Sequence, residues 1–165
     1  MQIDRVWAMP NSETFSIKPI KELLQSEVTT GIWLDPFARN SKVATITNDL
    51  NPACGTDYHM EAGDFLRQFS QEYADGILFD PPYSPRQIKE CYQGIGLTEY
   101  NTKMDFYSSV KDEVTRVVKR GGKVVSFGWS SMGMGKNRGF EMIKILMIPH
   151  GGNKNDTIVT VERKL

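Results

Sequence analysis

Cysteine is scarce in this sequence: only Cys54 and Cys91 occur among 165 residues. Two cysteines cannot build a disulfide scaffold or a four-cysteine zinc site, so free thiols are expected. No apolar stretch reaches about 18 residues, the length that a membrane-spanning helix needs. The first ten residues include Asp4 and Arg5, where a signal peptide would be apolar. These absences predict a soluble cytoplasmic chain that has no membrane partner.

Net charge is also absent, but the two halves of the chain differ in sign. Residues 1–80 hold 6 Lys and Arg against 12 Asp and Glu, whereas residues 81–165 hold 14 against 8. A basic half can meet a polyanion, and an acidic half can hold a cationic small molecule. Two solvated faces would give the same pattern, so the charge decides little without a motif beside it.

The order of predicted elements indicates one α/β domain over residues 1–165, since no repeat or low-complexity tract divides the chain. Helices are expected at 18–26, 64–70 and 105–119, and strands at 31–35, 43–47, 58–61, 76–79 and 123–127. The tail, with strands at 140–148 and 157–161, reads as an antiparallel β-hairpin. The fold class predicted is a mostly parallel sheet, covered on both faces, that ends in this hairpin. The segments 84–103 and 130–139 lack periodicity and are expected to be long loops.

Acidic residues follow several of the predicted strands. Asp35, Asp49 and Asp80 stand at strand ends or just past them, and Asp64 follows the weaker third strand. Ligands of open α/β sheets bind outside the carboxyl ends of the strands. An acidic residue past the second strand is placed to accept hydrogen bonds from ribose hydroxyls. Each aspartate alone could simply cap a helix or turn.

The most specific motif is Asp80-Pro81-Pro82-Tyr83, directly after an apolar strand. Two prolines remove two backbone donors and fix two φ angles, which leaves a stiff turn rich in carbonyl groups. Asp80 and the Pro81 carbonyl can then accept two N–H bonds from an exocyclic amine, and Tyr83 can stack on the ring that carries it. A plain strand-ending turn with a surface tyrosine is the alternative.

This tetrapeptide resembles the hallmark of amino-methylating DNA methyltransferases that use S-adenosylmethionine (SAM), above all the N6-adenine enzymes. The resemblance implies a Rossmann-like class I methyltransferase fold, and in detail the chain is similar to short enzymes carried by bacterial viruses, which would act in the host cytoplasm. It assigns catalysis to Asp80, Pro81, Pro82 and Tyr83, and SAM binding to Phe15, Asp35, Pro36, Phe37, Asp49, Leu50, Asp64 and Phe65. In that pattern Asp49 holds the cofactor ribose, and Asp64 and Phe65 meet its adenine.

Two departures from the family pattern stand out. Arg39-Asn40-Ser41 replaces the usual glycine-rich turn, so the chain cannot approach the cofactor by the usual tight route. No separate target-recognition domain fits in 165 residues. Sequence choice must then come from 84–103, from 130–136, or from a partner subunit or second copy of the chain. Arg86 and Lys89, which closely follow the Asp80–Tyr83 motif, are predicted to hold DNA phosphates. RNA is the alternative nucleic acid partner.

Other functions stay open at this stage. The same tetrapeptide suits cytosine N4, an RNA adenine or an amide side chain, and the altered turn also allows a non-catalytic SAM- or nucleic-acid-binding module. His59 and His150 have no metal-ligand partner at suitable spacing, and no metal is expected. Met132 and Met134, between glycines, suggest a mobile loop over the site.

Overall fold

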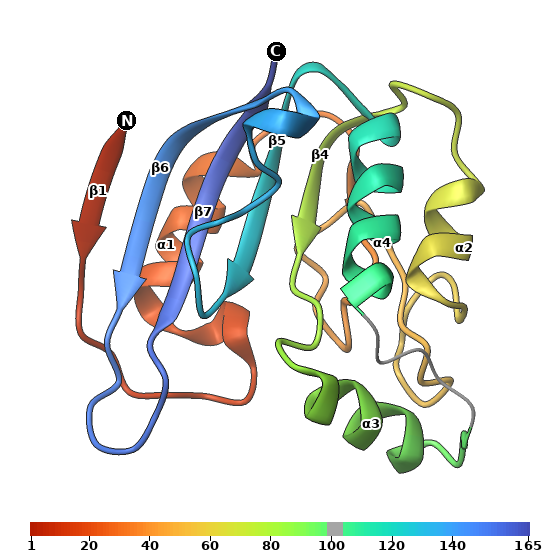
Figure 1. Ribbon diagram of the computed structural model, residues 1–165, viewed down its shortest axis with the longest axis horizontal. Helices are drawn as coiled ribbons and strands as arrows, with labels where there is room; N and C mark the ends of the chain where they lie inside the picture. The colour runs from red at the N-terminus through yellow and green to blue at the C-terminus, as the bar shows by residue number, and fades with distance from the viewer. Residues whose placement is uncertain (99–103) are drawn as a thin grey trace.

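Seven strands form one sheet in the order β1-β6-β7-β5-β4-β2-β3 (Figure 1). The computed structural model describes residues 1–98 and 104–165. The strands are β1 (Gln2–Arg5), β2 (Trp33–Asp35), β3 (Ile46–Thr47), β4 (Ala74–Phe79), β5 (Val118–Gly128), β6 (Phe140–Ile148) and β7 (Thr157–Lys164). All pair in parallel except β7, which is antiparallel to β5 and β6. The α/β class, the mostly parallel sheet and the terminal hairpin are therefore confirmed.

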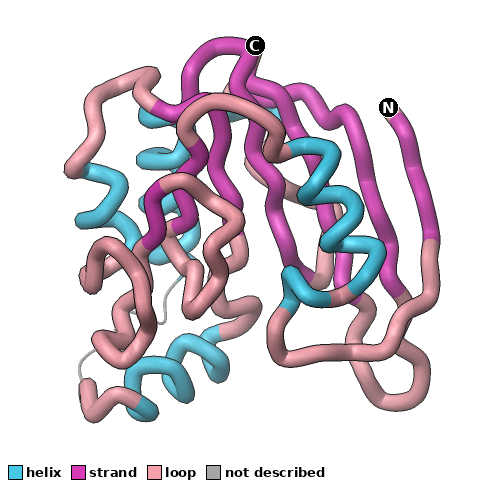
Figure 2. Tube along the Cα trace, turned by 180° about the vertical axis from the view of Figure 1, so that it is seen from behind, coloured by secondary structure: helices cyan, strands magenta, loops and turns pink. Residues whose placement is uncertain are grey.

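Helices cover both faces of the sheet, as Figures 1 and 2 show from opposite sides. They are α1 (Lys18–Glu27), α2 (Ala62–Arg67), α3 (Pro85–Gly94) and α4 (Met104–Val117), with 3-10 turns η1 (Thr14–Ser16) and η2 (Lys136–Arg138). Among the described residues, none of these helices is both long enough and apolar enough to cross a membrane.

Alternation along the central strands creates two apolar cores. In β4, Ile77 and Phe79 face α2 and α4, whereas Leu78 between them faces α1. Successive residues of a strand point to opposite faces, so a continuous apolar run is what a sheet covered on both sides requires. The buried run Ile77-Leu78-Phe79 thus places the start of the Asp80 motif at a rigid, fully packed strand end.

Two strands differ from expectation at the β3 edge of the sheet. β3 has only two residues, and the strand expected at 58–61 is reduced to one parallel bridge between Asn48 and Tyr58. The Asn48 side chain supplies the missing ladder: its Nδ2 donates to the carbonyls of Pro36 (3.1 Å) and Met60 (2.9 Å), and its Oδ1 accepts from Met60 N (3.1 Å). At the opposite edge, β1 was not expected; it pairs with β6.

The prediction of a long loop at 84–103 is wrong over its first half, where α3 forms. Ser84 caps the helix, because its hydroxyl accepts a hydrogen bond from Gln87 N (3.2 Å), and Pro85 fills the first turn, where a missing N–H costs nothing. Ile88 and Tyr92, four residues apart, are its buried positions. Residues 99–103 of the expected loop lie outside the described residues.

The loop after β5 is fixed where a mobile segment was expected. The buried carboxylate of Glu162 in β7 accepts hydrogen bonds from the backbone N–H groups of Met134 (2.6 Å) and Gly135 (3.0 Å). Met134 itself is buried in the core under α4, whereas Met132 is 76% exposed. The segment 129–132 presents its side chains to solvent, as do Lys136 and Asn137 farther along the loop.

Candidate functional site

A cavity of about 780 Å³ opens where β2, β3 and β4 end. Residues that follow these strands line it: Pro36 and Phe37 after β2, Asp49 and Leu50 after β3, and Asp80 to Tyr83 after β4. Further wall comes from α3, the start of α2, and the segment before and within η1. The volume and the mixed lining are typical of a small-molecule site at the carboxyl edge of an α/β sheet.

Asp80 and Tyr83 touch each other across the turn. The Tyr83 hydroxyl donates a hydrogen bond to Asp80 Oδ1 at 2.5 Å. Burial raises the pKa of Asp80, while hydrogen bonds from Tyr83 and Thr14 and the positive charge of Arg39 act in the opposite direction. Burial beside this carboxylate also raises the pKa of Tyr83, so the phenol stays a hydrogen-bond donor. Asp80 thus keeps one oxygen, Oδ2, beyond its contact with Tyr83.

The turn itself is held from two helices. Gln87 of α3 accepts the Tyr83 N–H through its Oε1 at 2.5 Å, and Tyr107 of α4 donates its hydroxyl to the Pro82 carbonyl at 2.5 Å. The prolines fix φ at two further positions. The four motif residues are therefore positioned by the backbone and by neighbouring helices, which agrees with the stiff turn expected from the sequence.

Asp49 accepts two backbone N–H groups at the floor of the cavity. Its Oδ2 accepts from Arg39 N and its Oδ1 from Asn51 N, both at 2.9 Å. Arg39 has φ of 51°, the left-handed region that a glycine adopts without strain. The altered turn therefore keeps the backbone shape of a glycine turn, and the Arg39 side chain reaches across to the Ser12 carbonyl (2.7 Å).

Asp35 lies beneath the cavity and does not line it. The side chain is fully buried, and its Oδ1 accepts the Phe37 N–H at 3.0 Å. Its Oδ2 has no hydrogen-bond partner among the residues that the structure describes. Burial raises the pKa of Asp35 well above its ordinary value, and the charges of Asp80 and Asp49 add to this. The neighbouring Pro36 and Phe37 reach the cavity instead.

Asp64 and Phe65 lie away from the cavity, contrary to their assignment to the cofactor adenine. Phe65 is fully buried against the ring of Tyr58 (5.4 Å between centroids), and exposed Asp64 pairs with Arg67 at 2.6 Å. Because the cavity lies at the first residues of α2, Glu61 and Ala62 line it there. The Glu61 carboxylate accepts a hydrogen bond from the Tyr92 hydroxyl of α3. Sequence reasoning missed Glu61, although it ends the segment that bridges to β3.

Phe15 is also outside the lining. Its ring packs on Phe127 with centroids 4.8 Å apart, as part of the core on the α1 side. The residues of this segment that line the cavity are Ser12 and Thr14. This segment therefore meets the cavity through these smaller hydroxyl side chains and not through Phe15.

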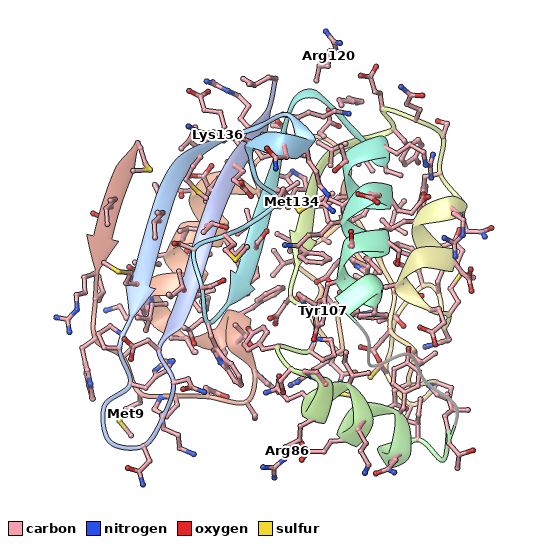
Figure 3. The ribbon with its side chains drawn as sticks, viewed as in Figure 1. Met9, Arg86, Tyr107, Arg120, Met134 and Lys136 are labelled. Atoms are coloured by element: carbon pink, nitrogen blue, oxygen red, sulfur yellow. The ribbon has the colours of Figure 1, made fainter. Side chains whose placement is uncertain are left out.

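The basic residues predicted to hold phosphates lie on the exposed side of α3. Both Arg86 and Lys89 are exposed, and Arg86 pairs with Glu90 at 2.8 Å. Figure 3 shows Arg86 pointing outward from α3, below the sheet. The same helix lines the cavity with Gln87, Glu90, Cys91 and Tyr92, so the carboxylate that pairs with Arg86 also reaches the cavity.

Neither cysteine nor histidine forms a metal centre. Cys54 and Cys91 are free thiols that line the cavity, and burial raises the pKa of both. His150 is buried between the Ala8 carbonyl (2.8 Å) and the Thr157 hydroxyl (2.7 Å), whereas His59 is exposed. Within residues 1–98 and 104–165, no group of three or more His, Cys, Asp or Glu side chains could hold a metal ion.

Comparison with known proteins identifies the fold. No family model and no curated protein matches the chain. Among solved structures, it is similar to the 1,6-didemethyltoxoflavin-N1-methyltransferase of Burkholderia thailandensis, with a TM-score of 0.61, 11% identity and coverage of 89% of this chain and 77% of that one. The chain has a methyltransferase fold.

Two further structures support this methyltransferase fold. TrmN from Thermus thermophilus gives a TM-score of 0.60 at 16% identity, with 90% of this chain and 49% of that chain covered. The N-methyltransferase NodS from Bradyrhizobium japonicum gives 0.56 at 14% identity, with 89% and 94% covered. At such low identity these likenesses show the architecture, and the chemistry of this chain must be argued from its own residues.

Proposed function

We propose that this chain transfers a methyl group from SAM to the exocyclic N6 amine of adenine in DNA. The observation that carries the proposal is the position of Asp80-Pro81-Pro82-Tyr83: it directly follows β4 and lines the same cavity as Asp49. A carboxylate, a proline carbonyl and an aromatic ring meet there at the rim of a site large enough for a nucleoside-sized cofactor.

The residues of the cavity fit SAM. Asp49 lies past the second strand of the Rossmann-like unit, where a carboxylate can accept hydrogen bonds from ribose hydroxyls while it holds the turn. Glu61 adds a carboxylate to the lining, which can accept hydrogen bonds from a ligand, and Phe37 and Leu50 offer apolar surface. The structurally similar B. thailandensis enzyme was crystallised with S-adenosylhomocysteine. When bound, SAM supplies a methyl group activated by its sulfonium charge.

Asp80 and Pro81 act on the amine of the target base. The amine is a poor nucleophile because its lone pair is delocalised into the ring. When Asp80 Oδ2 and the Pro81 carbonyl accept its two N–H bonds, the nitrogen becomes pyramidal and its lone pair points out of the ring plane. Positive charge grows on the nitrogen during transfer, so these acceptors bind the transition state more strongly than the ground state.

The step balances without any further reagent. The amine nitrogen forms a bond to the methyl carbon with its lone pair while the carbon–sulfur bond breaks. The electron pair of the broken carbon–sulfur bond stays on sulfur. The nitrogen then loses one proton. Burial raises the pKa of Asp80, which makes this carboxylate a better proton acceptor than an exposed one.

Access of the base requires that it leaves its stack. Extrusion costs a few kcal/mol in a duplex and less in single strands. In this proposal Arg86 and Lys89, both exposed on α3, hold phosphates of the strand that carries the extruded base. Tyr83 lies between these cations and Asp80 along the chain, and its ring gives the extruded base a surface on which to stack.

The test is transfer of labelled methyl from SAM to unmethylated DNA, followed by separation of the nucleosides. Label in N6-methyl-2′-deoxyadenosine is the expected result. Label in N4-methylcytosine, in RNA alone or in protein would show that the target is another amine and that the proposed substrate is wrong. No label in any acceptor, together with SAM binding in calorimetry, would leave a binding module.

A further inference from the structure

Trp129 is an exposed indole at the end of β5, next to the catalytic motif. It is 44% exposed, whereas Trp33 in the core is 3% exposed. Its ring centroid lies 5.6 Å from that of Tyr83, at an interplanar angle of 73°. Tyr83 lines the cavity, so Trp129 stands one ring outside its wall. A large apolar ring left in water beside a ligand site indicates contact with a further group.

The backbone is anchored on both sides of Trp129. Gly128 before it is paired in the sheet with Ile158, and Glu162 fixes the backbone at Met134 after it. Lys111 of α4 adds a hydrogen bond to the Gly133 carbonyl at 2.6 Å. The exposed segment 129–132 is thus a short stretch whose backbone is anchored at both ends.

The angle between the two rings decides which base Trp129 can meet. A base stacked on Tyr83 lies parallel to that ring, so a base stacked on Trp129 lies in a different plane, about 73° away. The exposed part of the indole is available for such a second base. An extruded nucleotide has turned out of the plane of its neighbours, so the next base along the strand has the orientation required.

We propose that Trp129 stacks on the nucleotide adjacent to the target and so contributes to the choice of sequence. This inference rests on the proposed function, since it takes Tyr83 to hold the target base. Stacking on aromatic side chains accepts any base but depends on how strongly that base stacks. Trp129 would therefore favour a purine beside the target adenine, in a chain whose sequence predicts no separate recognition domain.

The first experiment uses tryptophan fluorescence, because the chain has three tryptophans and only two are exposed. A short single-stranded DNA with one adenine is titrated, with S-adenosylhomocysteine present to prevent turnover, into Trp7→Phe and Trp129→Phe. Each variant removes one exposed indole. Quenching should persist in Trp7→Phe and fall to a small remainder in Trp129→Phe. Equal quenching in the two variants would overturn the proposal.

The second experiment locates the base by removing it. Trp129→Ala should bind the oligonucleotide about 5- to 150-fold more weakly than wild type, as the absence of one stacking interaction requires. Trp129→Phe should recover most of this affinity, and Met132→Ala, which removes another exposed apolar side chain of the same segment, should bind as wild type. An abasic site next to the adenine should weaken wild type but not Trp129→Ala.

The outcomes separate this inference from the proposed function. If an abasic neighbour on either side weakens wild type and Trp129→Ala by the same factor, Trp129 does not stack on that base and the inference is wrong. If the abasic effect depends on Trp129 but wild type transfers no methyl group to DNA, the stacking contact stands and the proposed reaction is wrong.

Discussion

Tyr83 donates its hydroxyl to the Asp80 carboxylate at 2.5 Å, so the two outer residues of the motif hold each other. From the sequence, Tyr83 is expected to act through its aromatic ring. The contact gives the phenol a second role: it keeps Asp80 oriented and favours its ionised form, since a hydrogen bond to a carboxylate lowers its pKa. Oδ2, the oxygen that Tyr83 does not contact, is the one proposed to accept from the amine of the target base, and Thr14 is a further hydrogen-bond donor to this carboxylate.

Tyr83→Phe tests this second role. The ring is kept, so base stacking and much of the activity should remain. The phenol hydroxyl is gone, however, so its hydrogen bond no longer offsets the rise in the pKa of Asp80 that burial causes. The pKa of Asp80 should rise further. Because the ionised carboxylate is the acceptor, the rate is lost as the pH falls through this pKa. The acid limb of the single-turnover rate should therefore move to higher pH in Tyr83→Phe, and an unmoved limb would contradict the role.

Asp49 should govern the affinity for SAM. Asp49→Ala should weaken SAM binding by about 1.5–3 kcal/mol, the size of a missing hydrogen bond to a charged group. Asp49→Asn keeps one acceptor and should lose less. Asp64→Ala is the matched control, because this exposed carboxylate lies outside the cavity and should leave the affinity unchanged. Calorimetry that gives equal affinities for Asp49→Ala and wild type would remove Asp49 from the site.

The cations of α3 should appear in the salt dependence of DNA binding. Arg86→Ala or Lys89→Ala should weaken binding and reduce the salt slope by about one for each phosphate that is no longer neutralised. Arg120→Ala is the control: Arg120 is exposed in β5, at the far end of the molecule from Arg86 in Figure 3. If the three variants share the wild-type slope, the two α3 cations are merely solvated.

Asp35 should lower the stability of the protein at neutral pH. Its pKa is raised in the fold, so the unfolded chain releases this proton at lower pH than the folded chain does. The free energy of unfolding therefore falls as the pH rises from about 4 through the raised pKa, by about 1.4 kcal/mol for every pH unit between the unfolded and the folded pKa. Asp35→Asn, which cannot ionise, lacks this loss. The free energy of unfolding of Asp35→Asn, measured by urea denaturation, should exceed that of wild type by more at pH 8 than at pH 5.

Asp75, whose pKa is lowered in the fold and not raised, provides the control for Asp35. A hydrogen bond from Lys119 lowers the pKa of Asp75, whose contribution to stability is lost only below about pH 4. Asp75→Asn should therefore differ from wild type by the same amount at pH 5 and pH 8. If Asp35→Asn raises the free energy of unfolding by the same amount at both pH values, the pKa of Asp35 is not raised in the folded protein.

Much of the fold was predictable because its signals are local. The apolar run before Asp80 and the two prolines after it mark a buried strand and its end, and the spacing of Val110, Val114 and Val117 marks a helix. β1 escaped prediction because its pairing with β6 joins residues more than 140 positions apart. α3 was missed, although a serine and a proline at its start are ordinary helix signals, because only two of its ten residues are buried.

The site was predictable where a residue directly follows a strand. Asp49, Asp80 and Tyr83 line the cavity because strand ends fix their positions. Glu61 was not found because the strand before it is a single bridge, held together by the Asn48 side chain instead of a ladder. Asp64 was assigned from family spacing, but α2 turns its buried positions Ala62, Phe65 and Leu66 inward and so leaves Asp64 in solvent.

The most direct test of the catalytic assignment is the single-turnover rate of Asp80→Ala on an adenine-containing DNA. A thermal melt and a SAM titration of the same variant should match wild type, because prolines and helix contacts hold the turn. The rate should fall about 10²- to 10³-fold, as when an enzyme loses one preorganised group that stabilises its transition state. If folded, SAM-bound Asp80→Ala methylates at the wild-type rate, Asp80 is not catalytic and the proposed mechanism is wrong.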